Sequence, residues 1–316
     1  MPSIVYSPRY RIDIGTHVFP TRKYELLREF LAEHNLASPE DFVEPEPASW
    51  EDLGLVHLPE YLDKVRHGTL DEDEQAQLEI RWSPEMVEGF RLMAGGTILA
   101  ARLALCAPLP APARRQAPPY AFTASLGIHL GGGFHHACED HGEGFCLFHD
   151  VAVAIRVLQR ERRIARAAVV DCDVHHGNGT AMIFAGDRSV FTFSMHQEHN
   201  YPTFKPHGSL DLHLPDYCDD EMYLRQLAGA LPRVFASAPD VVFYLAGADP
   251  YERDQLGGLS LTKEGLRRRD RMVFAAAKEV RVPVVVTLAG GYARFVEDTV
   301  EIHAATVEEG LRAFAA

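Results

Sequence analysis

The sequence predicts an α/β fold, with three α/β/α layers and a mainly parallel central sheet. Short runs rich in Val, Ile and Ala alternate with longer stretches of helical periodicity. This alternation is typical of parallel sheets that helices cover on both faces. The chain has 316 residues and no visible internal repeat, so we expect one domain over residues 1–316.

The expected strands are apolar runs of four to six residues, and the longer periodic stretches are the expected helices. The strands are SIVY at 3–6, SLGIHL at 125–130, RAAVV at 166–170, SVFTFS at 189–194, DVVFYL at 240–245 and PVVVTL at 283–288. The helices are expected at 21–34, 84–105, 147–162, 219–236, 262–280 and 296–315. Segment 107–119 contains five prolines and is therefore expected to be an irregular surface loop.

A polar cluster is expected at the carboxyl end of each of the five later strands. In chain order these clusters are GGGFHH, DCDVHH, SMHQ, AGAD and AGGY. The carboxyl ends of parallel strands lie at one edge of the sheet, where ligands bind. We therefore expect five segments that are distant in sequence to converge on one site.

Composition excludes several classes of protein. A net charge of -14 argues against direct nucleic-acid binding, which requires clustered Lys and Arg. The five cysteines include no C-x-x-C pair, so neither a disulfide framework nor a cysteine zinc cluster is expected. The chain has no run of 18 apolar residues and no basic-then-apolar start. We expect a cytoplasmic protein without membrane attachment.

A metal site is predicted after the strand at 166–170. Asp171, Asp173 and His175 are spaced at i, i+2 and i+4, so their side chains would share one face if the strand continued. Asp249 in AGAD can supply a further ligand. Two carboxylates and one histidine, with a position open for water, suit a catalytic zinc. The alternative is that these residues cap the next helix or are solvated.

Two adjacent histidines, His135 and His136, follow three glycines that allow a tight turn. Histidine suits general acid/base catalysis at neutral pH, and Asp171 and Asn178 could orient the two rings. A surface loop with incidental histidines is the alternative.

Aromatic residues near these clusters have two possible roles. Tyr292 in AGGY could donate a hydrogen bond to a developing oxyanion, or it could pack on the sheet edge. Gly144 and Phe145 in GEGFC, with Tyr201 in HNYP, could line an apolar tunnel, or the aromatic rings could belong to the core.

Together, GGGFHHA, GEGFC, DCDVHHGNG, AGAD and AGGY resemble the histone deacetylase superfamily, which has the arginase-like α/β fold. The resemblance covers nearly the whole chain. IVYSPRY, AGGTILAARLAL and DQLGGLSLTKEGLRRRD are most similar to class IV enzymes and their bacterial relatives.

The resemblance implies a role for each matched position. Asp173, His175 and Asp249 match the ligands of one catalytic zinc. His135 and His136 match the catalytic histidine pair.

Other matched positions surround this centre. Tyr292 matches the oxyanion-stabilising tyrosine, and Asp171 matches the carboxylate that pairs with the first histidine. Phe145, with its neighbour Gly144, and Tyr201 match the tunnel walls. The resemblance also implies a structural potassium ion at Asp171, Asp173, His175, Ser194 and Met195.

Two positions depart from the class I pattern. Asn178 stands where class I enzymes carry an Asp that partners the second histidine. Trp82 stands where they carry an Asp that binds the substrate main chain, so we expect little dependence on the peptide around the substrate.

The predicted function is zinc-dependent hydrolysis of an N-acyl amide, with acyl-lysine side chains of proteins or peptides as substrates. The alternatives are an acetylpolyamine amidohydrolase and a non-catalytic acyl-lysine binding protein. The binding protein would be expected to lack a ligand, a histidine or the tyrosine. A manganese ureohydrolase would need more carboxylates to bridge two metals.

Overall fold

The computed structural model describes residues 4–105 and 125–315. Within these ranges one sheet has the strand order β2-β1-β3-β8-β7-β4-β5-β6, and every neighbouring pair is parallel. The strands are β1 (Ile4–Val5), β2 (Phe42–Val43), β3 (Leu126–His129), β4 (Ala167–Asp171), β5 (Val190–Gln197), β6 (Leu210–Leu214), β7 (Val241–Leu245) and β8 (Val284–Thr287). The predicted fold class is confirmed.

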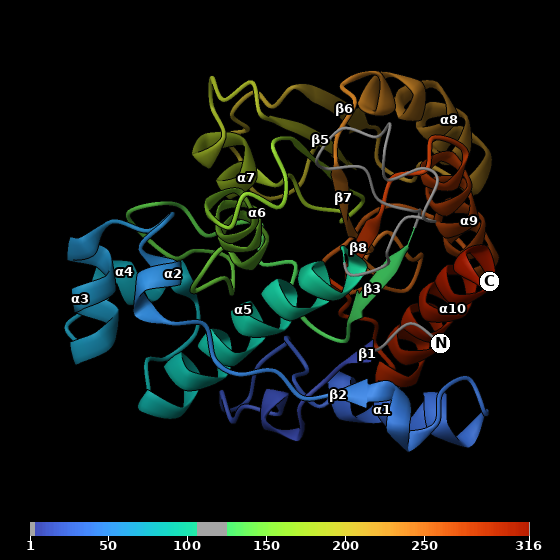
Figure 1. Ribbon diagram of the computed structural model, residues 1–316. Helices are drawn as coiled ribbons and strands as arrows, with labels where there is room; N and C mark the ends of the chain where they lie inside the picture. The colour runs from blue at the N-terminus through green and yellow to red at the C-terminus, as the bar shows by residue number, and fades with distance from the viewer. Residues whose placement is uncertain (1–3, 106–124, 316) are drawn as a thin grey trace.

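Helices cover both faces of the sheet (Figure 1). They are α1 (Lys23–Glu33), α2 (Trp50–Leu53), α3 (Pro59–His67), α4 (Glu72–Leu78), α5 (Pro84–Ala104), α6 (Asp150–Arg160), α7 (Asn178–Ile183), α8 (Asp220–Ala236), α9 (Lys263–Glu279) and α10 (Val296–Phe314). One layer contains α5, which packs on β1, β3 and β8 and against α6. In the other layer α8, α9 and α10 lie side by side, and α1 packs against α10. None of these described helices has the length and apolar character needed to cross a membrane.

Side-chain caps determine where several helices begin. Ser83 accepts a hydrogen bond from the backbone N–H of Met86 at the start of α5, and Thr262 accepts one from Gly265 at the start of α9. The helix expected at 147–162 begins later than predicted because His149 is its cap and accepts from Ala152.

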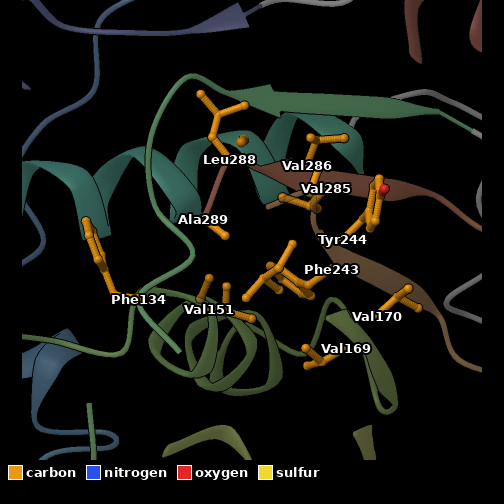
Figure 2. Close-up of a cluster of buried hydrophobic side chains, with 14 of the residues drawn as sticks. Phe134, Val151, Val169, Val170, Phe243, Tyr244, Val285, Val286, Leu288 and Ala289 are labelled. Carbon is orange, nitrogen blue, oxygen red and sulfur yellow. The ribbon is translucent and has the colours of Figure 1, made fainter. Parts of the chain in front are cut away.

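The core is built by the alternation of strand side chains. Val169, Phe243 and Val285 are register partners on β4, β7 and β8. Figure 2 shows Phe243 directed toward Val151 of α6. The next residue of β7, Tyr244, packs its ring on Phe274 of α9. Successive residues therefore face opposite helix layers, which explains why these strands are apolar throughout.

Several elements were not predicted. β6 reads Leu-Asp-Leu-His-Leu at the edge of the sheet, so only alternate residues are apolar and no continuous apolar run marks it. β2 has only two residues, and α2, α3, α4 and α7 are short. The proline-rich segment 107–119 lies outside the described residues.

Candidate active site

Four central strands, β3, β8, β7 and β4, are adjacent in the sheet and bring four of the predicted clusters to one edge (Figure 1). His135 and His136 follow β3, Asp173 and His175 follow β4, and Tyr292 follows β8. The fifth cluster, SMHQ, does not follow a strand as predicted. It forms the second half of β5, because β5 continues to Gln197 and pairs there with the unpredicted β6.

Three buried side chains form a candidate metal site. Asp173, His175 and Asp249 each place a possible ligand atom within 4.8 Å of the others. They do not lie on a continuing strand, because β4 ends at Asp171. Instead the chain bends, with the N–H of Asp173 donating to Asp171 Oδ1 (3.1 Å) and that of His175 donating to Asp173 Oδ1 (2.9 Å).

The donor set fits a divalent cation. Asp249 Oδ2 is buried and accepts no well-aligned hydrogen bond among the described residues, and the His175 Nδ1 atom 3.3 Å away is itself a possible ligand atom. Burying such an oxygen is costly unless a cation binds it. Burial and the negative charge of Asp173 raise the pKa of Asp249 to about 7. Two carboxylates and one imidazole are the ligands expected for a catalytic zinc.

Gly290 allows the backbone after β8 to approach these ligands. Its N–H donates to Asp173 Oδ2 (2.7 Å). A Cβ at this position would lie 1.9 Å from Asp249 Oδ2 and 2.6 Å from Asp173 Oδ2. Only glycine therefore fits without moving a ligand.

The two histidines lie side by side next to this site. His135 Nδ1 donates to Asp171 Oδ2 (2.7 Å), and His136 Nδ1 lies 2.6 Å from Asn178 Oδ1. Their Nε2 atoms are 3.1 Å apart. The structure thus pairs each histidine with the side chain predicted to orient it.

The environments of the two rings separate their pKa values. Burial would lower the pKa of His135, but the charges of Asp171 and Asp173 outweigh it and raise that pKa to about 9. Burial, together with the positive charges of His135 and His175, lowers the pKa of His136 well below its usual value. A charged and a neutral imidazole therefore stand next to each other, a division typical of acid/base sites.

A pocket of about 190 Å³ opens onto these groups. Its lining residues are Glu79, His136, Gly144, Phe145, His175, Asn200, Tyr201, Leu256 and Tyr292. The Tyr201 ring meets His136 edge-on with 4.9 Å between ring centres, and the Phe145 and Tyr292 rings are 5.9 Å apart. All three residues predicted as tunnel walls line the pocket. A larger hollow of about 510 Å³ beside β5 contains none of the predicted catalytic residues.

The residues predicted to bind potassium lie on β4 and β5 or directly after β4. Asp171 and Ser194 are register partners on β4 and β5, and Met195 follows Ser194. Ser194 Oγ also lies 2.9 Å from His196 Nδ1. The potassium ion stays a prediction.

Three charged residues at the site were not predicted. Glu143 accepts a hydrogen bond from Asn178, and Glu79 lines the pocket. Lys23 is buried and donates to the carbonyl of Ala289 (2.9 Å), with its ammonium 5.7 Å from the centre of the Tyr292 ring. Burial lowers the pKa of Lys23 to about 8, although nearby carboxylates oppose this effect. Lys23 and Glu79 lie outside the motifs, whereas Glu143 lies within GEGFC, where only Gly144 and Phe145 were given a role.

Trp82 lies away from the pocket. Its indole N–H donates to the carbonyl of Val65 (2.8 Å), and its ring packs over Gly68. The acidic side chain at the pocket is Glu79, three residues earlier in the chain. The absence of an Asp at position 82 therefore does not leave the pocket without a carboxylate.

Comparison with known proteins agrees with this architecture. The model of the histone deacetylase domain matches residues 17–307. An uncharacterized protein of Picosynechococcus is 39% identical over 95% of both chains. Histone deacetylase 2 of Arabidopsis thaliana is 30% identical, over 95% of this chain and 78% of its own. The crystal structure of a histone deacetylase homologue complexed with SAHA superposes with a TM-score of 0.76 at 22% identity, covering 98% of this chain and 83% of that one.

The family match covers most of the chain, and the strand order and the residues at the sheet edge agree with it. The chain belongs to the histone deacetylase family.

Proposed function

We propose that the chain is a single catalytic domain that hydrolyses N-acyl amides in a zinc-dependent reaction, with acyl-lysine side chains as substrates. The observation that carries the proposal is the position of Asp173, His175 and Asp249 beside His136 and Tyr292 at one aromatic-walled pocket. The family supports a deacetylase or related amidohydrolase.

The metal would be held by Asp173, His175 and Asp249. A zinc ion bound there would polarise the acyl carbonyl and lower the pKa of a bound water. Burial and the neighbouring positive charges hold the pKa of His136 well below its usual value, so the ring is neutral, as a general base must be, and it lines the pocket. We infer that it takes the proton of the attacking water and returns one to the leaving amine.

Tyr292 and His135 would stabilise charge in this reaction. The Tyr292 side chain lines the pocket, where its hydroxyl can donate to the oxygen of the acyl carbonyl as negative charge develops. His135, paired with Asp171, carries positive charge 3.1 Å from the base. An oxyanion donor of this kind contributes about 10²–10³-fold to kcat.

The pocket supports an extended acyl amine as the substrate. Phe145 and Tyr201 line the pocket with apolar rings that suit an aliphatic chain, and Gly144 lies close to the His136 and Tyr201 rings. A Cβ on Gly144 would come within 2.8 Å of His136 and 3.1 Å of Tyr201. A side chain at this position would therefore narrow the pocket.

Glu79 favours a second candidate, hydrolysis of a small acylated polyamine. It is exposed and lines the pocket, so its carboxylate could bind a distant ammonium group of such a substrate. A non-catalytic acyl-lysine binder is less favoured, because the chain retains the ligand set and both histidines, and His136, His175 and Tyr292 line the pocket.

Turnover tests these candidates directly. Acetyl-lysine peptides, longer acyl-lysine peptides and acetylpolyamines are compared before chelation, after chelation and after zinc is restored. We expect amide hydrolysis that chelation abolishes and zinc restores. Glu79→Gln should weaken only polyamine turnover if the second candidate holds. Full activity after exhaustive chelation would refute zinc dependence, and binding without turnover would favour the non-catalytic reading.

A further inference from the structure

Glu143 is a buried carboxylate beside the candidate catalytic residues, with only 8% of its surface exposed. Oε1 accepts hydrogen bonds from Asn178 Nδ2 (2.5 Å) and from the Tyr201 hydroxyl (3.1 Å). Oε2 accepts one from Gln77 Nε2 (2.9 Å) and lies 3.3 Å from His141 Nε2. Burial alone would raise the pKa of Glu143, but these hydrogen bonds outweigh it and lower the pKa to about 2. The side chain is therefore an anion at neutral pH.

An anionic carboxylate can only accept hydrogen bonds. Asn178 must therefore direct its NH₂ group toward Glu143, although the two ends of an amide have nearly the same shape. Its carbonyl oxygen then faces His136 Nδ1 at 2.6 Å. A carbonyl oxygen is only an acceptor, so Nδ1 must carry the hydrogen. In a neutral imidazole this leaves the lone pair on Nε2.

Nε2 is the ring atom that a base in this position needs. It lies 3.1 Å from His135 Nε2, on the side of the ring opposite Asn178. With the reverse amide orientation, Asn178 would offer an N–H to Nδ1 and favour the tautomer with its hydrogen on Nε2. That tautomer cannot accept a proton at Nε2.

We propose that Glu143 is a positioning residue for His136. Acting through Asn178, it holds the ring in the tautomer that has its hydrogen on Nδ1 and its lone pair on Nε2. The negative charge that class I enzymes place beside the second histidine is thus one side chain further away in this protein. The same carboxylate accepts a hydrogen bond from the hydroxyl of Tyr201, whose ring lines the pocket and contacts His136. The proposal rests on the proposed function, in which His136 is the base.

The test uses Glu143→Gln, which keeps the shape of the side chain but can present either a donor or an acceptor to Asn178. Nitrogen NMR of histidine-labelled, zinc-loaded protein reports the tautomer of His136, assigned by comparison with His136→Ala. Wild type should show hydrogen on Nδ1 alone. Glu143→Gln should show a mixture of both tautomers, with kcat on an acetyl-lysine peptide lowered about 10-fold or more at equal zinc content.

Three further variants distinguish a role of Glu143 in orienting His136 from a merely structural role in its own segment, GEGFC. Gln77→Ala removes a bond to the same carboxylate and should leave kcat and the tautomer unchanged. Tyr201→Phe removes the hydrogen bond between the Tyr201 hydroxyl and Glu143, and it should change KM while His136 keeps one tautomer. Asn178→Ala removes the connecting amide and should by itself abolish the tautomer preference. In that background Glu143→Gln should change kcat by less than about 2-fold.

The outcomes are separable. A single Nδ1–H tautomer in Glu143→Gln, or effects of Glu143→Gln and Asn178→Ala on kcat that simply add, would overturn the proposal. If Glu143→Gln does not fold, a single Nδ1–H tautomer of His136 in Asn178→Ala still overturns the proposal. Wild type without turnover on any acyl amide would contradict the proposed function instead, and the NMR comparison would still decide the role of Glu143.

Discussion

Gly290→Ala should weaken metal binding without preventing the protein from folding. The added Cβ would lie 1.9 Å from Asp249 Oδ2 and 2.6 Å from Asp173 Oδ2, whereas real Cβ contacts stay above 3.0 Å. The Asp249 carboxylate must therefore retreat by about 1 Å, well beyond the tolerance of roughly 0.2 Å for metal–ligand distances. We expect zinc affinity to fall about 10²-fold, which corresponds to about 2.7 kcal/mol of binding free energy.

The assay measures the zinc dissociation constant by competition with a chelator, together with kcat at saturating zinc. Gly229→Ala is the matched control, because Gly229 is exposed in α8 and nothing lies within 4 Å of the added Cβ. This control should bind zinc normally and be stabilised by up to about 1 kcal/mol through its higher helix propensity. If Gly290→Ala binds zinc with wild-type affinity, the backbone after β8 does not shape the site as described.

Three other perturbations have expected outcomes. Asp249→Ala should lose both bound metal and activity, measured as metal content per chain and turnover; a variant that keeps its metal would exclude Asp249 as a ligand. Tyr292→Phe should lower kcat by about 10²-fold with little change in KM, and near-normal kcat would mean that the hydroxyl does not stabilise the oxyanion. Glu143 has a folded-state pKa of about 2, below its usual 4.5, so its stabilisation is complete above about pH 5 and is lost as the pH falls toward 2. That stabilisation is about 3 kcal/mol at most. In urea unfolding, the difference in the free energy of unfolding between wild type and Glu143→Gln should therefore shrink by about 1 kcal/mol from pH 6.5 to pH 3.5. A difference that stays constant over this range would contradict the lowered pKa.

Much of the fold could be predicted because the central strands are buried on both faces. Continuous apolar runs marked β4, β7 and β8, and polar residues directly after them marked the site edge. The edge strand β6 buries only one face, so the same criterion did not find it.

The candidate site was predicted where the residue types in a motif suggest a role, whereas Lys23 and Glu79 lie outside the motifs and Glu143 was passed over within GEGFC. The bend after Asp171 depends on side chain to backbone hydrogen bonds, which hydrophobic periodicity does not report. Glu143 is one acidic residue between two glycines, and its partners Asn178 and Tyr201 come from distant segments. Its role becomes visible only when the tertiary structure joins these segments.

The strand order has a consequence for biosynthesis. β8 lies between β3 and β7, so β3 and β7 cannot be joined until the chain beyond Thr287 has left the ribosome. His135 and His136 are synthesised some 150 residues before Tyr292, at a stage when the sheet still lacks β8. Such non-local pairing is slow to form and leaves apolar strands exposed in the nascent chain. A ribosome-bound nascent chain that ends before β8 therefore carries all three candidate metal ligands but lacks Gly290 and Tyr292.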